Sequence, residues 1–217
     1  MPGYGQLVEG VERWRRFPGR ERIESGVALT FDDGPDPDAT PAVLDVLERA
    51  GARATFFLVG EQLLVHHELG RAVAEAGHAL GLHGFRHVEH DELDDPRDDL
   101  LRGLDAIEAA TGVRPRLCRP PYGRFSEASY AACKELELEP VYWSAWGMDW
   151  EPLTVDRIAD LVSRDLSDGA IVLLHDSARY APRASAEPTA TALEAVLAEI
   201  RERGLALAGL EREGGDR

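Results

Sequence analysis

The stretch "VALTFDDGP", residues 27–35, joins an apolar run to two adjacent acidic residues and a turn signal. Its first five residues are apolar or β-branched, which is typical of a strand buried on both faces of a parallel sheet. Asp32 and Asp33 follow directly, and Gly34 and Pro35 predict a sharp turn after them. Neighbouring side chains of a strand point to opposite faces, so we expect the two carboxylates to diverge where the strand ends and to serve separate functions.

Six further apolar or β-branched runs, separated by helix-forming segments, give seven candidate strands in all. The six runs are "ATFFLVG" from Ala54, "HALGLHG" from His78, "RLCRPP" from Arg116, "PVYWSAW" from Pro140, "AIVLLHD" from Ala170 and "LALAGL" from Leu205. N-cap residues such as Thr40, together with Pro and Gly, predict helices over about residues 40–51, 62–76, 95–112, 126–137, 154–168 and 188–204. This alternation predicts a parallel sheet with helices outside it, and seven units favour a barrel over an open sheet.

The length and composition are those of one domain with a sizeable core, since 44% of the 217 residues are hydrophobic. We expect a single domain over residues 1–217, in which residues 1–25 form an N-terminal extension and residues 26–210 form the catalytic barrel. Cys118 and Cys133 lack the C-x-x-C spacing of a metal site, so two free thiols are expected.

The net charge of −16 argues against a nucleic acid or an anionic membrane surface as a partner. No stretch reaches the length of a transmembrane helix, and nothing indicates an obligate protein partner. The N-terminal sequence lacks the apolar core of a signal peptide. As printed, the chain is expected in the cytoplasm; if the printed chain is a trimmed one, it is expected to be secreted.

Polar residues of the catalytic kind follow five of the predicted strands. The five clusters are Asp32 with Asp33, His83 with His87, Arg119 with Tyr122, Asp149 with Trp150, and His175 with Asp176. The carboxyl ends of the strands of a barrel share one rim, and chemistry gathers there. Each cluster alone also fits a purely structural role, such as a stiff turn or a strand-end cap. Their joint placement at one rim predicts an active site.

The segment "HGFRH" places His83 and His87 four residues apart, where two imidazoles can meet one metal ion. With one carboxylate they form a site with open positions, which suits zinc, cobalt, nickel or iron. Taken alone, the spacing also describes a solvated helix face. Two histidines and one carboxylate also describe iron(II) oxygenases, so an oxygen-dependent reaction is a rival.

Five motifs of the chain resemble, in order, those of the polysaccharide deacetylase family, the NodB-homology group also called carbohydrate esterase family 4. They are "TFDDGP", "HGFRH", "RPPYG", the "DW" that follows "WSAWG", and "LLHD". The resemblance spans about residues 27–210 and implies a distorted (β/α)7 barrel, in agreement with the seven candidate strands. It also implies an enzyme that hydrolyses N-acetyl groups with the help of a divalent metal.

The resemblance implies three groups of site residues. The metal ligands, for zinc or alternatively cobalt or nickel, would be Asp33, His83 and His87. The catalytic residues would be Asp32 as general base, Arg119 as the partner that holds Asp32, His175 as general acid, and Asp149 as the partner that tunes His175. The substrate residues would be Tyr122 as a backbone oxyanion donor, Trp150 as a wall of the groove, and Leu173 in the acetyl pocket.

Two positions depart from the family motifs. Gly84 stands where the second motif usually has a hydroxyl residue that braces the loop, which could alter ligand geometry or metal affinity. Trp146 stands where the fourth motif usually has its first aspartate, and Asp149 retains the second. We expect Trp146 to change the wall of the groove and to leave the chemistry intact.

The main expectation is a metal-dependent N-deacetylase that acts on an amino-sugar glycan of the chitin or peptidoglycan type and releases acetate. One alternative is a deacylase of a small soluble N-acyl compound, and another is a silent relative that binds glycans without turnover. The remaining histidines are expected to be structural or solvent-facing: His66, His67, His78 and His90. The remaining large aromatic residues are expected in the core: Trp14, Trp143, Phe56 and Phe57.

Overall fold

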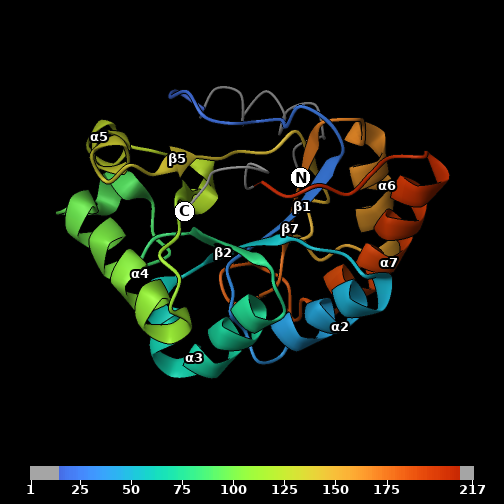
Figure 1. The fold of residues 1–217 in the computed structure, drawn as a ribbon, viewed down its shortest axis with the longest axis horizontal. Helices are drawn as coiled ribbons and strands as arrows, with labels where there is room; N and C mark the ends of the chain where they lie inside the picture. Colours follow the sequence, from blue (N-terminus) through green and yellow to red (C-terminus); the bar gives the residue numbers. More distant parts are fainter. Residues whose placement is uncertain (1–14, 211–217) are drawn as a thin grey trace.

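A computed structural model describes residues 15–210, and these contain one seven-stranded parallel sheet of order β5-β4-β3-β2-β1-β7-β6. Figure 1 shows the sheet with helices arranged around it. Its strands are β1 Val27–Asp32, β2 Thr55–Leu58, β3 Ala79–Leu82, β4 Leu117–Cys118, β5 Glu139–Pro140, β6 Ala145–Trp146 and β7 Ala170–His175. The sheet curls, and its two edge strands β5 and β6 do not pair. The predicted distorted (β/α)7 barrel is confirmed.

The residues that precede β1 link the edge strand β5 to β7, the neighbour of the other edge strand β6. Arg20 pairs with Val141, just beyond β5, and Arg22 pairs with Ala170 at the start of β7. The Arg20 N–H donates to the Pro140 carbonyl over 2.8 Å. Residues 20–22 therefore cross the gap that the missing β5–β6 pairing leaves. Trp14 and the rest of residues 1–14 lie outside the described residues.

The predicted number of strands is confirmed, but two of the predicted segments were wrong. The run "PVYWSAW" supplies two strands, because the chain leaves β4 after Val141 and meets β7 only at Ser144, whose N–H donates to the Ile171 carbonyl. The run from Leu205 adds no strand to the sheet. It makes one bridge, between Leu207 and Val27, and much of it stays exposed, so it lacks the burial of a core strand.

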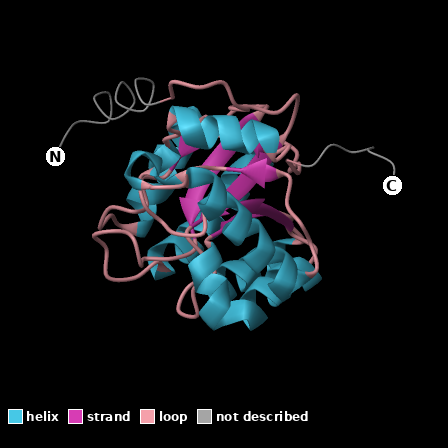
Figure 2. Ribbon diagram, turned by 90° about the vertical axis from the view of Figure 1, so that its left-hand side faces the viewer, coloured by secondary structure: helices cyan, strands magenta, loops and turns pink. Residues whose placement is uncertain are grey.

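Helices cover the outside of the sheet, which lies at the centre of the molecule (Figure 2). They are α2 Thr40–Ala50, α3 Gly60–Glu75, α4 Pro96–Thr111, α5 Glu127–Glu135, α6 Val155–Asp165 and α7 Glu187–Glu202, with two 3-10 turns, η1 His90–Glu92 and η2 Pro121–Gly123. Side chains cap α4, α5 and α6 at the positions expected: Asp95, Ser126 and Thr154.

Thr40 does not cap α2 as predicted. It is the first residue of the helix, and its hydroxyl instead donates to the Asp176 carboxylate over 2.6 Å and accepts from the Asp36 N–H over 2.8 Å. The hydroxyl thus ties α2 to the end of β7 and is not available to the helix N-terminus.

The core lies between the sheet and the helices. Every residue of β1 is buried, as expected of a central parallel strand, and Phe31 stacks on Phe56 at 5.1 Å between ring centroids. Cys118 and Cys133 are buried free thiols, as predicted. None of the described helices combines the length and the apolar character needed to span a membrane.

Candidate active site

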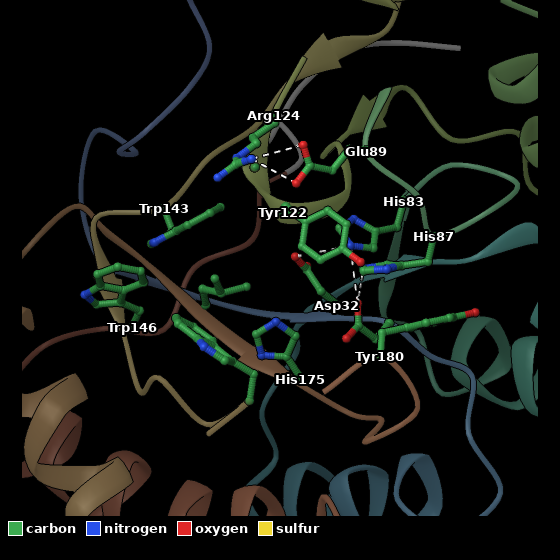
Figure 3. Close-up of a pocket in the computed structure, with 14 residues that line it drawn as sticks. Asp32, His83, His87, Glu89, Tyr122, Arg124, Trp143, Trp146, His175 and Tyr180 are labelled. Atoms are coloured by element: carbon green, nitrogen blue, oxygen red, sulfur yellow. Dashed lines mark hydrogen bonds and ion pairs between the residues drawn. The ribbon is translucent and has the colours of Figure 1, made fainter. Parts of the chain in front are cut away.

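A cavity of about 260 Å³ opens at the carboxyl ends of the strands, and polar and aromatic residues from distant parts of the chain line it (Figure 3). The lining residues are Asp32, Asp33, His83, His87, Glu89, Tyr122, Gly123, Arg124, Trp143, Trp146, Trp150, Leu173, His175 and Tyr180. Parallel strands place their carboxyl ends on one rim, so residues that follow different strands meet here.

Three buried side chains offer a set of metal ligands on one side of the cavity. The Oδ1 atom of Asp33 lies 3.4 Å from His83 Nε2 and 3.1 Å from His87 Nε2, and one ligand atom from each residue falls within 4.8 Å of the others. Asp33 Oδ1 is buried and has no ordinary hydrogen bond among the described residues. Two imidazoles and an otherwise unsatisfied carboxylate oxygen fit a divalent transition metal with open positions.

The backbone aims Asp33 away from the line of β1. Its φ is 80°, in the left-handed region that aspartate tolerates better than most residues, so the side chain turns toward the histidines where the strand ends. Burial alone would raise the pKa of Asp33, but the imidazoles of His83 and His87 hold that pKa well below its usual range. Asp33 is therefore ionised at neutral pH, the form that binds metals.

The two histidines are held by different means. His83 Nδ1 lies 2.8 Å from the Arg119 carbonyl, so the Nδ1–H donates there and the lone pair of Nε2 faces the cavity. His87 Nδ1 has no hydrogen-bond partner among the described residues. Its ring is instead stacked on Tyr180, at 4.1 Å between centroids and 10° between planes, with the edge of Tyr122 at 4.7 Å.

Asp32, the neighbour of Asp33, is bound by a buried arginine. Arg119 Nη1 donates to Asp32 Oδ1 over 2.7 Å and to Thr30 Oγ1 over 2.8 Å, and Arg119 Nη2 donates to the Tyr142 carbonyl over 2.8 Å. The guanidinium is fully buried and lies 4.2 Å from the Phe57 ring centroid. Asp32 Oδ2 is left facing the metal ligands, 3.9 Å from His83 Nε2.

His175 and Asp149 form a second pair beside the cavity. His175 Nδ1 lies 2.9 Å from Asp149 Oδ1, so the other ring nitrogen, Nε2, is not used by this bond. Burial alone would lower the pKa of His175, but the Asp149 carboxylate raises it to about 9, with help from Asp33 and Asp32. Burial alone would raise the pKa of Asp149, but His175 and Arg183 lower it. The pair is an imidazolium and a carboxylate at neutral pH.

An aromatic wall lies across the cavity from the two histidine ligands (Figure 3). Trp146 lies between Trp143 and Trp150, with centroid distances of 6.0 and 5.4 Å, and Trp150 meets His175 edge-on at 5.6 Å. Leu173 completes the apolar lining.

The comparisons with known proteins agree on one family. The family model described as polysaccharide deacetylase matches residues 19–141, more than half of the 217 residues. The chain belongs to the polysaccharide deacetylase family.

The relatives of this chain include two deacetylases that are each 35% identical to it. A peptidoglycan-N-acetylglucosamine deacetylase from Bacillus cereus is 35% identical over 200 residues, which cover 90% of this chain and 89% of the relative. A chitooligosaccharide deacetylase from a Bradyrhizobium species is 35% identical over 189 residues, which cover 82% of this chain and 85% of the relative.

Solved structures of the family share the fold. One is a peptidoglycan N-acetylglucosamine deacetylase bound to 4-naphthalen-1-yl-N-oxidanyl-benzamide; it superposes with a TM-score of 0.81 at 25% identity over 97% of this chain and 95% of that one. Another is a CE4 family pseudoenzyme from Bacillus anthracis, with a TM-score of 0.76 at 26% identity over 89% of this chain and 65% of that one. The fold therefore accommodates both enzymes and silent relatives.

The loop of the second motif is braced in this chain without the usual hydroxyl. Gly84 has a φ of 83°, and a Cβ atom there would lie 2.9 Å from the Arg86 carbonyl oxygen. Asp99, buried on α4, accepts from the Phe85 N–H over 2.8 Å and from the Arg86 N–H over 3.3 Å. A carboxylate from another element thus ties the loop between the two histidine ligands to α4.

The substrate residues expected from the family motifs also lie at this cavity. The Tyr122 ring is 48% exposed, and its backbone has a φ of 58°, unusual for a residue with a large side chain. Trp146, at the position of the missing aspartate, is buried in the aromatic wall. Trp143 was expected in the core; it is buried there, and it also lines the cavity and packs 5.6 Å from the Arg119 guanidinium.

Several residues of the site carry no recognisable signal in the sequence. Tyr180 lies in the loop after β7, and its hydroxyl donates to Glu61 over 2.8 Å and accepts from Gln62 over 2.7 Å. Arg183 and Thr189 contact Asp149 from the same loop and from α7. None of these belongs to a motif, and their contacts join segments far apart in the sequence.

Proposed function

We propose that the chain is a metal-dependent hydrolase that removes N-acetyl groups from an amino-sugar glycan and releases acetate. The proposal rests on one observation: the metal-ligand set, Asp32 and His175 line a single cavity, and buried partners hold the last two, Arg119 for Asp32 and Asp149 for His175. Amide hydrolysis needs an attacking water, stabilisation of the oxyanion and a proton for the departing nitrogen. Each of the three requirements has a candidate group here.

The metal would be held by Asp33, His83 and His87, with zinc as the expected ion and cobalt or nickel as alternatives. When bound, it would lower the pKa of a water toward about 7 and polarise the acyl carbonyl.

Asp32 is proposed to accept the proton of the attacking water. Its Oδ1 atom is occupied by Arg119, so Oδ2, which faces the metal ligands, is the atom that takes the proton. The hydrogen bonds from Arg119 to Thr30 and Tyr142 fix the guanidinium, and the guanidinium fixes the carboxylate. General bases placed in this way contribute about 10²- to 10⁴-fold in rate.

His175 is proposed to give its proton to the leaving nitrogen as the C–N bond breaks. Its pKa, raised to about 9, keeps it protonated at neutral pH, and its Nδ1 atom is bound by Asp149, so Nε2 is the donor. The N–H of Tyr122 is proposed to donate to the oxyanion, a contribution on the order of 3 kcal/mol. The products are acetate and a free amine.

The aromatic wall supports a sugar as the substrate. Rings such as those of Trp146, Trp150 and Tyr122 offer flat apolar faces at the cavity, and Leu173 offers a small apolar contact for an acetyl methyl group. Similarity to deacetylases of peptidoglycan and of chitooligosaccharides supports the same class.

The test is acetate release by the zinc-loaded protein from chitooligosaccharides and peptidoglycan fragments, compared with monomeric N-acetylglucosamine and N-acetyl amino acids. We expect acetate and free amine in equal amounts, with larger kcat/KM for the oligomers. A larger kcat/KM for a small N-acetyl compound would show that the substrate is a small soluble compound and that it is not a glycan. Glycan binding with no acetate would assign the chain to the silent relatives.

A further inference from the structure

We propose that Thr189 and Arg183 are positioning residues that hold the Asp149 carboxylate against His175. This inference rests on the proposed function, because it extends the proton-donating half of the same site. Neither residue lies in a family motif, and neither lines the main cavity.

The Asp149 carboxylate is fully buried, so each of its oxygens needs donors to remain ionised. Oδ1 accepts from His175 Nδ1–H over 2.9 Å. Oδ2 accepts from the His175 backbone N–H over 2.9 Å and from the Thr189 hydroxyl over 2.7 Å. Thr189 thus supplies a bond to Asp149 that does not come from His175 itself.

Arg183 decides the direction in which the Thr189 hydroxyl donates. Its Nη1 atom donates to Thr189 Oγ1 over 2.5 Å. A guanidinium can only donate, so the single hydroxyl proton of Thr189 is left for Asp149. Thr189 also lies in the first turn of α7, where the N–H groups and the helix dipole favour a nearby negative charge.

The same guanidinium holds the end of the strand that carries His175. Arg183 Nη2 donates to the Ser177 carbonyl over 2.8 Å and to the His175 carbonyl over 3.2 Å. Arg183 Nη1 lies 3.5 Å from Asp149 Oδ2. The nearly buried Arg183 side chain therefore links the His175 backbone and the Asp149 carboxylate to α7. Holding these groups in a fixed geometry is the function of a positioning residue.

Charged groups reach His175 from each neighbouring segment. Asp149 precedes α6, Asp32 ends β1 and Asp33 follows it, and Arg183 is one of the two arginines, with Arg179, of the loop after β7. A metal ion at Asp33 would add positive charge. Removing the positive charge of Arg183 should therefore favour the protonated form of His175. Removing the Thr189 hydroxyl should chiefly let the Asp149 carboxylate move away from its place beside His175.

The first experiment compares Thr189→Val with Thr189→Ser in the zinc-loaded protein. We expect Thr189→Val to lower kcat by about 10- to 100-fold, a loss comparable to the one that follows removal of a hydrogen-bond partner of a metal ligand. KM and zinc content should stay within about twofold, and Thr189→Ser should recover most of the loss. Thr191→Val, an exposed change two residues along α7, is the matched control and should behave like the wild type.

Two substitutions of Arg183 distinguish the effect of its positive charge from the effect of its hydrogen bonds. Arg183→Met is expected to lower kcat and to move the alkaline limb of the pH profile upward by about half a unit to one unit, because a positive charge near the imidazolium is gone. Arg183→Lys should keep the limb in place but lower kcat, since an ammonium cannot reproduce the fork of bonds to Thr189, His175 and Ser177.

A second readout does not depend on acetate release. The His175 Nδ1–H proton, hydrogen-bonded to Asp149, should give a downfield resonance in the wild type that shifts or broadens in Thr189→Val and persists in Thr191→Val. An unchanged resonance and unchanged kcat in Thr189→Val would overturn the proposal, as would equal losses in Thr189→Val and Thr191→Val. If the wild type released no acetate, the deacetylase function would fail while the resonance would still decide the role of Thr189.

Discussion

Replacing Asp32 by asparagine is expected to lower acetate release by about 10³-fold, or about 4 kcal/mol of transition-state stabilisation, while the protein keeps its metal. Asparagine has the same shape and can still accept the Arg119 hydrogen bond at its carbonyl oxygen. It cannot take a proton from the attacking water. The measurement is kcat on an acetylated oligosaccharide together with metal analysis of the same preparation.

The matched control for this change is Asp38→Asn, on the exposed part of the turn that follows β1. We expect kcat and metal content to match the wild type in that variant. Loss of the metal from Asp32→Asn would contradict the division of roles between Asp32 and Asp33, because Asp32 would then be a ligand.

Replacing His87 by alanine is expected to weaken zinc binding by at least about 100-fold, since the loss of a hydrogen bond that merely supports a ligand already costs about 10- to 100-fold. Acetate release should fall with the bound zinc. The reason is that His87 Nε2 lies 3.1 Å from Asp33 Oδ1 and supplies one of the three proposed ligands. The measurement is a zinc-competition titration with a chromophoric chelator.

His67→Ala is the control for that change, because His67 is an exposed histidine on α3 and is not one of the proposed ligands. Zinc affinity in His67→Ala should be that of the wild type. If His87→Ala bound zinc as tightly as the wild type, the metal would lie elsewhere and the proposed ligand set would be wrong.

The strands were predictable where burial is continuous. The run at β1 is apolar and β-branched throughout, and the structure buries all of it, so pattern and fold agree. The prediction of a single strand from the apolar run at Pro140 was wrong, because periodicity does not reveal that the chain changes partner strands between Val141 and Ser144. The prediction of a strand from Leu205 was wrong, because an apolar segment can pack at the edge of a fold without becoming a strand of its sheet.

The adjacent aspartates were predictable from alternation and from the turn. Asp32, still on β1, faces Arg119, and Asp33, with its left-handed backbone, faces the two histidines. Their repulsion is offset by different partners. The partners meet because each family motif lies at the end of a strand, and these strand ends share one rim of the sheet.

The supporting residues were not predictable, for a physical reason. Thr189 reaches Asp149 across 40 positions of the sequence, and Tyr180 reaches Glu61 across 119. A threonine in the first turn of a helix and a tyrosine in a loop look the same whether they support a site or face solvent. Only the packing of the loop after β7 against α3 and α7 gives them their contacts. Asp99 is similar, since its role follows from the close approach of α4 to the histidine loop.

The proposal that this chain hydrolyses N-acetyl groups with one bound metal is tested by titrating the chelator-treated protein with zinc while acetate release is recorded. We expect negligible release without metal and a rise that ends at one zinc per chain, with one free amine formed for each acetate. Release that is equally fast without metal, or a protein that binds zinc and glycan but yields no acetate at any zinc level, would contradict it.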